Sequence, residues 1–155
     1  MTEEILSVWI LAASGVQLGT LWIMKTSIIP LLNALPYDRY VNTCQLIDMH
    51  VFHPIALWNG VAAAGIAAYL AVVAPNAAAT VLFAVGSASM LVVGITSEGV
   101  NRPIWRQIEL WSPRRVAERW QAKRRVWHLA HETRTFGALA AAGCFALATI
   151  LVTTS

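Results

Sequence analysis

The sequence predicts an all-α integral membrane protein, a bundle of four transmembrane helices forming one domain over residues 1–155. It is 57% hydrophobic and only 12% charged, whereas soluble domains carry about 25% charged residues. The apolar residues also come in uncharged blocks, each close to the roughly 20 residues that cross a bilayer as a helix. The four blocks are residues 5–24, 54–74, 77–97 and 135–155.

The first helix is predicted from about residue 4 to 29, ending before Pro30, because proline lacks the N–H that would continue it. Gly15 and Gly19 stand four residues apart, a spacing that lets membrane helices pack closely. The N-terminus is acidic and no small-residue cleavage site follows a short apolar core. We therefore expect this first span to be retained rather than removed as a signal peptide.

The second helix is predicted to run from about Tyr37 to Val73. Its first part, residues 39–50, is polar enough to project from the membrane into the cytoplasm. Pro54 falls inside the helix and is predicted to kink it. A tight turn at Pro75 makes the second and third helices antiparallel neighbours.

The third helix is predicted over residues 77–97, with a break at 98–103 and a short amphipathic segment starting at Pro103. Ser112 followed by Pro113 fits a helix N-cap with proline in the first turn. The fourth helix is therefore predicted over residues 113–152. Its first part is strongly charged, so we expect it to project into the cytoplasm too.

The basic residues predict the orientation in the membrane. Eight lysines or arginines lie in residues 102–125, and none lies in the connection around residues 75–76. The positive-inside rule places residues 102–125 and 25–39 in the cytoplasm and both termini outside, as for a protein of a bacterial inner or plasma membrane. Topology and contact with anionic lipid account for the basic run, so no nucleic-acid partner is expected.

All four histidines belong to two copies of one spacing, His50 with His53 and His128 with His131. An i, i+3 pair places two imidazoles on one face of a helix, one turn apart. Each pair directly precedes or begins a long apolar run. A histidine at a membrane boundary is costly unless it is paired or liganded, so the four imidazoles are expected to converge on one site.

Polar residues of all four predicted helices lie at one depth. Counted from the outer ends of the spans at 1.5 Å per residue, Lys25, His53, Glu98 and His131 are all roughly 30 Å from the outer face. This level is the cytoplasmic edge of the hydrocarbon. The sequence leaves three interpretations open: a metal or haem site, a metal-free polar catalytic pocket, or ordinary polarity at the interface.

For a metal site, imidazole suits zinc, copper, iron and nickel. The His-x-x-His spacing, in place of Glu-x-x-His, favours copper or a histidine-rich iron site with one ion or a close pair. Lys25 and Glu132 are expected beside the cofactor, Glu132 as an acceptor for an imidazole N–H. As an alternative, one histidine from each of the second and fourth helices would ligate a b-type haem. The expected metal ligands are His50, His53, His128, His131 and Glu98.

The back half of the chain resembles the anthrone-oxygenase-like family of small four-helix membrane proteins. The resemblance rests on the run from Asn101 to Ile104, the tryptophan-bearing segment 120–124, and Trp127, His131 and Arg134 before a final small-residue span. The glycine-bearing first span ending at Pro30 is similar as well, so most of the chain is covered. Fungal members are associated with oxygenation of polycyclic phenols, anthrone to anthraquinone. The resemblance implies functional weight for Asn101, His131 and Arg134.

Together these observations predict a membrane oxidoreductase or oxygenase that acts on O₂ or a reduced oxygen species with a phenol- or quinol-like substrate from the lipid. Glu98, Asn101 and Arg134 are the expected catalytic residues, the latter two orienting substrate or stabilising an oxyanion. The alternatives are a haem-b electron carrier and a non-catalytic small transporter or assembly partner. A homodimer through the Gly15 and Gly19 face fits four short spans.

Overall fold

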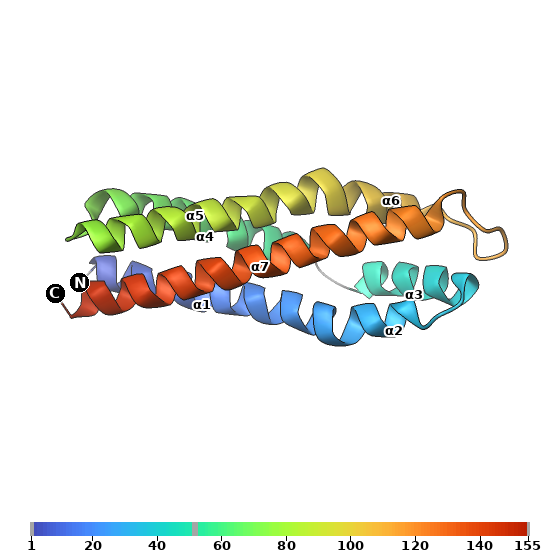
Figure 1. Ribbon diagram of the computed structural model, residues 1–155, viewed down its shortest axis with the longest axis horizontal. Helices are drawn as coiled ribbons and strands as arrows, with labels where there is room; N and C mark the ends of the chain where they lie inside the picture. The colour runs from blue at the N-terminus through green and yellow to red at the C-terminus, as the bar shows by residue number, and fades with distance from the viewer. Residues whose placement is uncertain (1, 51–52, 155) are drawn as a thin grey trace.

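A computed structural model describes residues 2–50 and 53–154, with side chains described for 2–47 and 58–154. The described residues are helical apart from short connections and contain no strand, and both termini lie at one end of an elongated molecule (Figure 1). In chain order the elements are α1 (Thr2–Ile23), the π-helical turn η1 (Met24–Ile28), α2 (Ile29–Asn33), α3 (Tyr37–His50), α4 (His53–Val73), α5 (Ala77–Thr96), the π-helical turn η2 (Ser97–Asn101), α6 (Arg102–Glu109) and α7 (Trp120–Thr153).

Three continuous helical stretches are long and apolar enough to span a membrane, namely Thr2–Asn33, Ala77–Glu109 and Trp120–Thr153. A shorter apolar stretch is Trp58–Val73 in α4. Large aliphatic side chains on these stretches point outward, with Val72 85% and Ile95 71% exposed. Such surfaces are unfavourable in water and favourable against lipid tails, which indicates a membrane protein.

Helices α1, α4, α5 and α7 pack around one core. α1 lies against α4 and α7, and α5 lies against the same two helices. The core uses alanines where backbones approach closely and fills the remaining space with a few large side chains, as membrane helices do. Its largest members are Ile10, Leu70, Phe83, Met90 and Phe145, all at most 2% exposed.

Side-chain hydrogen bonds to backbone carbonyls connect these helices. Ser87 Oγ of α5 donates to the Ala64 carbonyl of α4 over 2.8 Å. Asn59 Nδ2 of α4 donates to the Ala13 carbonyl of α1 over 2.9 Å. In lipid such bonds satisfy polar groups that have no water to bind, so they fix which helices are neighbours.

The end of the molecule away from the termini is formed by α2, α3, α6 and the start of α7 (Figure 1). Its own core includes Leu32, Tyr40 and Ile108, each at most 1% exposed. Gln45 Nε2 of α3 donates to the carbonyl oxygens of Ile108 and Glu109 over 3.2 and 3.0 Å, at the end of α6. The polar first part of the predicted second helix therefore packs against α6.

The predicted end of the first helix before Pro30 is wrong, and so is the predicted break at residues 98–103. Both helices continue through a five-residue π turn, with Pro30 and Pro103 just after it. The Ile29 N–H bonds to the Met24 carbonyl, and the Arg102 N–H bonds to the Ser97 carbonyl, each five residues back. A proline ring clashes with the carbonyl four residues earlier in an α-helix, and the wider π turn displaces that carbonyl.

The fourth helix also differs from its prediction, and the second is only partly described. The helix expected from Tyr37 to Val73 is helical over α3 and α4, and the junction between them lies outside the described residues, as does the side chain of Pro54, where the kink is predicted. The last helix begins at Trp120, so the charged residues before it form a loop and not a projecting helix. Ser112 Oγ accepts a bond from the Arg114 N–H at 3.3 Å within that loop instead of capping a helix.

Gly15 and Gly19 take no part in packing within the chain. A Cβ added at either position would meet no atom within 4 Å. The close helix contacts are instead made at Gly86, where an added Cβ would overlap the Phe145 ring, and at Gly137, where it would lie 3.3 Å from the Ser89 carbonyl oxygen. The Gly15 and Gly19 face is thus an outer surface of α1.

Candidate functional site

His131 lies fully buried in α7, and both of its ring nitrogens are hydrogen-bonded to protein. Nε2 lies 3.0 Å from the Leu21 carbonyl oxygen of α1, and Nδ1 lies 2.9 Å from Nη2 of Arg134. Arginine only donates, so Nδ1 is the acceptor and the proton of the neutral ring is on Nε2, donated to Leu21. His131 therefore connects α1 to the guanidinium of Arg134.

Arg134 is half-buried, and its described partners are all neutral. Nη1 donates to Ser97 Oγ over 3.4 Å. With the Asn101 amide oriented so that its oxygen faces Arg134, that oxygen accepts from Nη2 at 2.5 Å and from Nε at 3.0 Å. A partly desolvated positive charge held by neutral acceptors is electrostatically incomplete and attracts an anionic oxygen.

The two π turns supply the groups on either side of α7. Ser97 and Asn101 are the first and last residues of η2, and Lys25 belongs to η1. Both turns contact α7. π turns inside α-helices occur frequently at functional sites, where they redirect side chains that a regular helix would spread around its circumference. Here they direct Asn101 to Arg134 and Lys25 to Glu132.

The two carboxylates predicted for the site, Glu98 and Glu132, are both in ion pairs. Lys25 Nζ binds Glu132 Oε2 and also lies 4.5 Å from the centre of the exposed Phe136 ring. Glu98 pairs with Arg102 one turn later on the surface. Glu132 was expected to accept an imidazole N–H, and the structure pairs it with Lys25 instead. Neither Glu98 nor Glu132 is among the partners that the structure gives to Arg134.

Aromatic rings pack next to His131. Trp127 is 3% exposed and stacks on His131 with ring centres 6.1 Å apart, and Trp105 lies 5.5 Å from Trp127. His128 lies against the same indole at 5.3 Å. Its Nε2 atom is buried and has no hydrogen-bond partner in the described part of the chain. Trp127 lies four residues before His131, a spacing that places both side chains on one face of α7.

The predicted metal ligands are only partly described, so the metal site stays a prediction; among them His128 keeps an unbonded Nε2. The side chains of His50 and His53 lie outside the described residues. His131 has both nitrogens engaged, and Glu98 is ion-paired. Among the residues with described side chains, no group of three or more His, Cys, Asp or Glu is placed to hold a metal ion. A haem ligated by His131 would likewise have to displace its bond to Leu21 or to Arg134.

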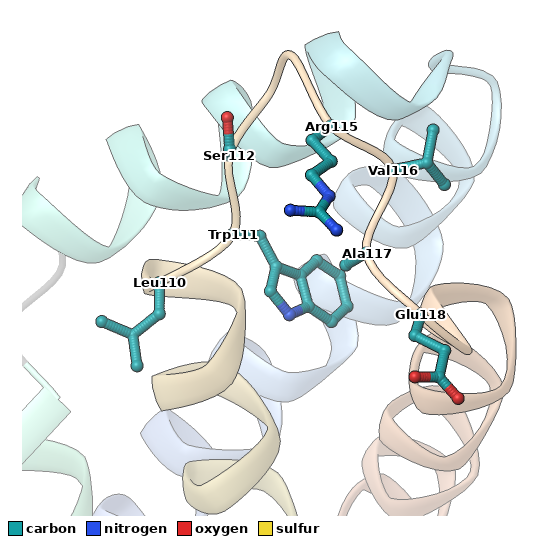
Figure 2. Close-up of a pocket in the computed structure, with 7 residues that line it drawn as sticks. All are labelled: Leu110, Trp111, Ser112, Arg115, Val116, Ala117 and Glu118. Carbon is teal, nitrogen blue, oxygen red and sulfur yellow. The ribbon is translucent and has the colours of Figure 1, made fainter.

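A separate pocket lies in the loop before α7, at the far end from the termini. Figure 2 shows Trp111 and Arg115 directed into this pocket, between Leu110 and Glu118. The Tyr37 hydroxyl anchors the loop by donating to the Arg115 carbonyl at 3.1 Å and accepting from the Ala117 N–H at 3.0 Å. This pocket contains none of the residues that surround Arg134.

Comparison with known proteins found no matching family model, no matching curated protein and no matching solved structure. The fold and the site nevertheless define a class: an all-helical chain with helices long and apolar enough for a membrane, and a polar cluster centred on one arginine. The cluster brings together Ser97, Asn101, His131 and Arg134 from η2 and α7.

Proposed function

We propose that this chain is an integral-membrane oxidoreductase of the oxygenase type that binds the oxygen of a phenol- or quinol-like substrate at Arg134. The single observation that carries the proposal is the half-buried guanidinium whose described partners, Ser97, Asn101 and His131, are all neutral. These three acceptors fix the plane of the guanidinium and leave its charge for a ligand.

A phenolic oxygen suits this site because the positive charge of Arg134 stabilises the ionised form of a bound phenol. A positive charge within hydrogen-bond distance lowers the pKa of a bound phenol, so the proton leaves and the phenolate remains. A phenolate gives up electrons to O₂ more readily than the neutral phenol does. Preorganised donors aimed at a developing oxyanion typically contribute 10²–10³ in rate.

The position of Arg134 along the bundle also supports a substrate from the lipid. α1 and α5 both begin at the end that carries the termini, so the chain has to return through α4 before α5 starts (Figure 1). We infer that α4 is a fourth crossing and that the end with α2, α3, α6 and the basic loop is cytoplasmic. The polar cluster then lies near the cytoplasmic edge of the hydrocarbon, where amphiphilic phenols and quinols reside.

The sequence resemblance to the anthrone-oxygenase-like family, which rests on Asn101, His131 and Arg134 among others, supports the same reaction class. The proposal rests on the Arg134 cluster and names no metal or haem; His131, with both ring nitrogens hydrogen-bonded to protein, is not a ligand in this arrangement. The alternative of a haem-b electron carrier would take its α7 ligand from His128, whose Nε2 has no partner among the described residues.

The test is oxygen consumption by purified protein in lipid nanodiscs supplied with a panel of quinols and fused-ring phenols. We expect at least one substrate to support protein-dependent O₂ uptake in the unaltered protein. Arg134→Met should lower kcat/KM by about 10²-fold or more, because it removes the charge while keeping much of the apolar length.

Arg125→Met is the matched control, since Arg125 is an exposed arginine on the same helix. It should leave the rate within about twofold of the unaltered protein. Two results would overturn the proposal: no substrate in the panel drives O₂ uptake, or Arg134→Met is as active as Arg125→Met while both proteins remain folded.

A further inference from the structure

We propose that the two histidines of the α7 pair have different tasks: His131 positions Arg134, whereas His128 contacts the substrate through its Nε2 atom. This inference rests on the proposed function and adds the substrate class, a flat aromatic compound with oxygens at opposite ends. His131 cannot make the second contact, because Leu21 and Arg134 already occupy its two nitrogens.

His128 is the available imidazole. Its Nε2 is shielded from solvent and finds no hydrogen-bond partner among the described residues, although buried polar atoms in native proteins nearly always have one. The charged groups that act on it are Arg124, one turn earlier on α7, and Glu132, one turn later, which Lys25 holds in an ion pair. Neither of them forms a hydrogen bond to Nε2, so this atom is left for a ligand.

The order of groups along α7 gives the shape of that ligand. His128, His131 and Arg134 follow one another at intervals of three residues, and the rise from His128 to Arg134 is about 9 Å. The buried Trp127 ring contacts both histidines, so the surroundings between the two polar ends are aromatic and apolar. A planar aromatic body with one oxygen near Arg134 and a hydroxyl near His128 matches this order of groups.

The probes that test this are 2,6-dihydroxynaphthalene, with hydroxyls at opposite ends, and 2-naphthol, with one hydroxyl. Binding to nanodisc-embedded protein is measured for the unaltered chain and for His128→Ala and Arg134→Met. We expect the unaltered protein to bind the diol about tenfold more tightly than 2-naphthol, the usual value of one added hydrogen bond. His128→Ala should abolish this preference, and Arg134→Met should weaken both ligands.

A second readout does not depend on any variant. With ¹⁵N-labelled histidine, the diol should shift the His128 ring signals, while 2-naphthol leaves them in place. The His131 ring should keep its Nε2–H tautomer throughout, because both of its nitrogens remain bonded to protein.

The possible failures can be told apart. If neither naphthol binds, or if Arg134→Met binds both as well as the unaltered protein, the proposed function itself is wrong. If Arg134→Met weakens both ligands but His128→Ala keeps the preference for the diol, only the role of His128 is overturned. Should His128→Ala fail to fold, His128→Gln and the labelled unaltered protein decide the same question, and an unshifted His128 signal at saturating diol contradicts it.

Discussion

At the scale of single residues, hydrogen-bond partners distinguish two histidines that look equivalent in the sequence. His131 donates to the Leu21 carbonyl and accepts from Arg134, while His128 Nε2 meets no described protein atom that could pair with it. A ring with both nitrogens engaged is a structural element of the site. The buried nitrogen of His128, unbonded among the described residues, is the observation on which the proposed ligand contact rests.

His131→Ala should destabilise the folded protein. The substitution removes the hydrogen bond to the Leu21 carbonyl and leaves one Arg134 N–H without its partner in the interior, which typically costs about 1–3 kcal/mol in the free energy of unfolding. The measurement is unfolding of nanodisc or detergent-solubilised protein followed by tryptophan fluorescence. His128→Ala, one turn away, is the control and should have a much smaller effect. Equal losses in the two variants would contradict the separate roles.

Cys44, in α3 outside the three long apolar stretches, predicts a pH effect. Burial raises the pKa of its thiol from the ordinary 9.0 to about 11. A folded pKa above the unfolded one means that the stabilising contribution is fully present below pH 9 and is lost as the pH rises toward 11. The free energy of unfolding should fall over this range more steeply in the unaltered protein than in Cys44→Ala. Parallel curves would show that the thiol does not take part.

At the scale of helices, two stretches that contain a proline both stay helical through a π turn placed just before it. Thr2–Asn33 and Ala77–Glu109 each contain an α-helix, a π turn, and a proline just beyond it. The π turn keeps each helix continuous past its proline and widens it beside α7, where Lys25 and Asn101 reach their partners. The rule that proline ends a helix therefore predicted helix ends at Pro30 and Pro103, where the chain instead forms π turns that carry residues of the site.

The close packing of α5 against α7 at Gly86 predicts how alanine substitutions in α5 change stability. A Cβ at this position of α5 would overlap the Phe145 ring of α7, whereas a Cβ at Gly94 of the same helix would meet nothing within 4 Å. Gly86→Ala should destabilise the protein by about 1–3 kcal/mol through overpacking. Gly94→Ala should be neutral or stabilising by up to about 1 kcal/mol, because alanine favours helix.

Thermal or denaturant unfolding of the two alanine variants side by side measures this difference. Combining Gly86→Ala with Phe145→Leu should recover part of the loss, since the smaller side chain makes room for the added methyl group. Gly86→Ala with stability equal to that of Gly94→Ala would show that α5 and α7 are less closely packed than described.

At the scale of the whole molecule, the arrangement predicts membrane topology. Both termini lie at one end, and the basic loop before α7 lies at the other (Figure 1). A C-terminal alkaline phosphatase fusion should be active outside the cytoplasm, and green fluorescent protein inserted in the 110–119 loop should fluoresce inside. An inactive C-terminal phosphatase together with a fluorescent C-terminal fusion would show the reverse orientation or an odd number of crossings.

The sequence predicted the helical class and three of the four long apolar stretches correctly, because hydropathy and helix length are local properties; the fourth is described only as the shorter stretch Trp58–Val73. It missed the packing of α3 against α6, the start of the last helix at Trp120, and both π turns, because these depend on contacts between distant segments. Gln45 bonding to the end of α6 is one such contact. Trp127 and Ser97 entered the site only when the helices were packed together.

By itself, the sequence determined that this chain is helical, that long parts of it suit a membrane, and that Lys25, Glu98, His131 and their neighbours recur near one level. Residue spacing and a constant rise per residue are enough for those conclusions. Only the tertiary structure decided which of these polar groups meet: Arg134 with Asn101, Ser97 and His131, and Lys25 with Glu132. Hydrogen-bond partners depend on the rotation of each helix about its axis, and packing sets that rotation.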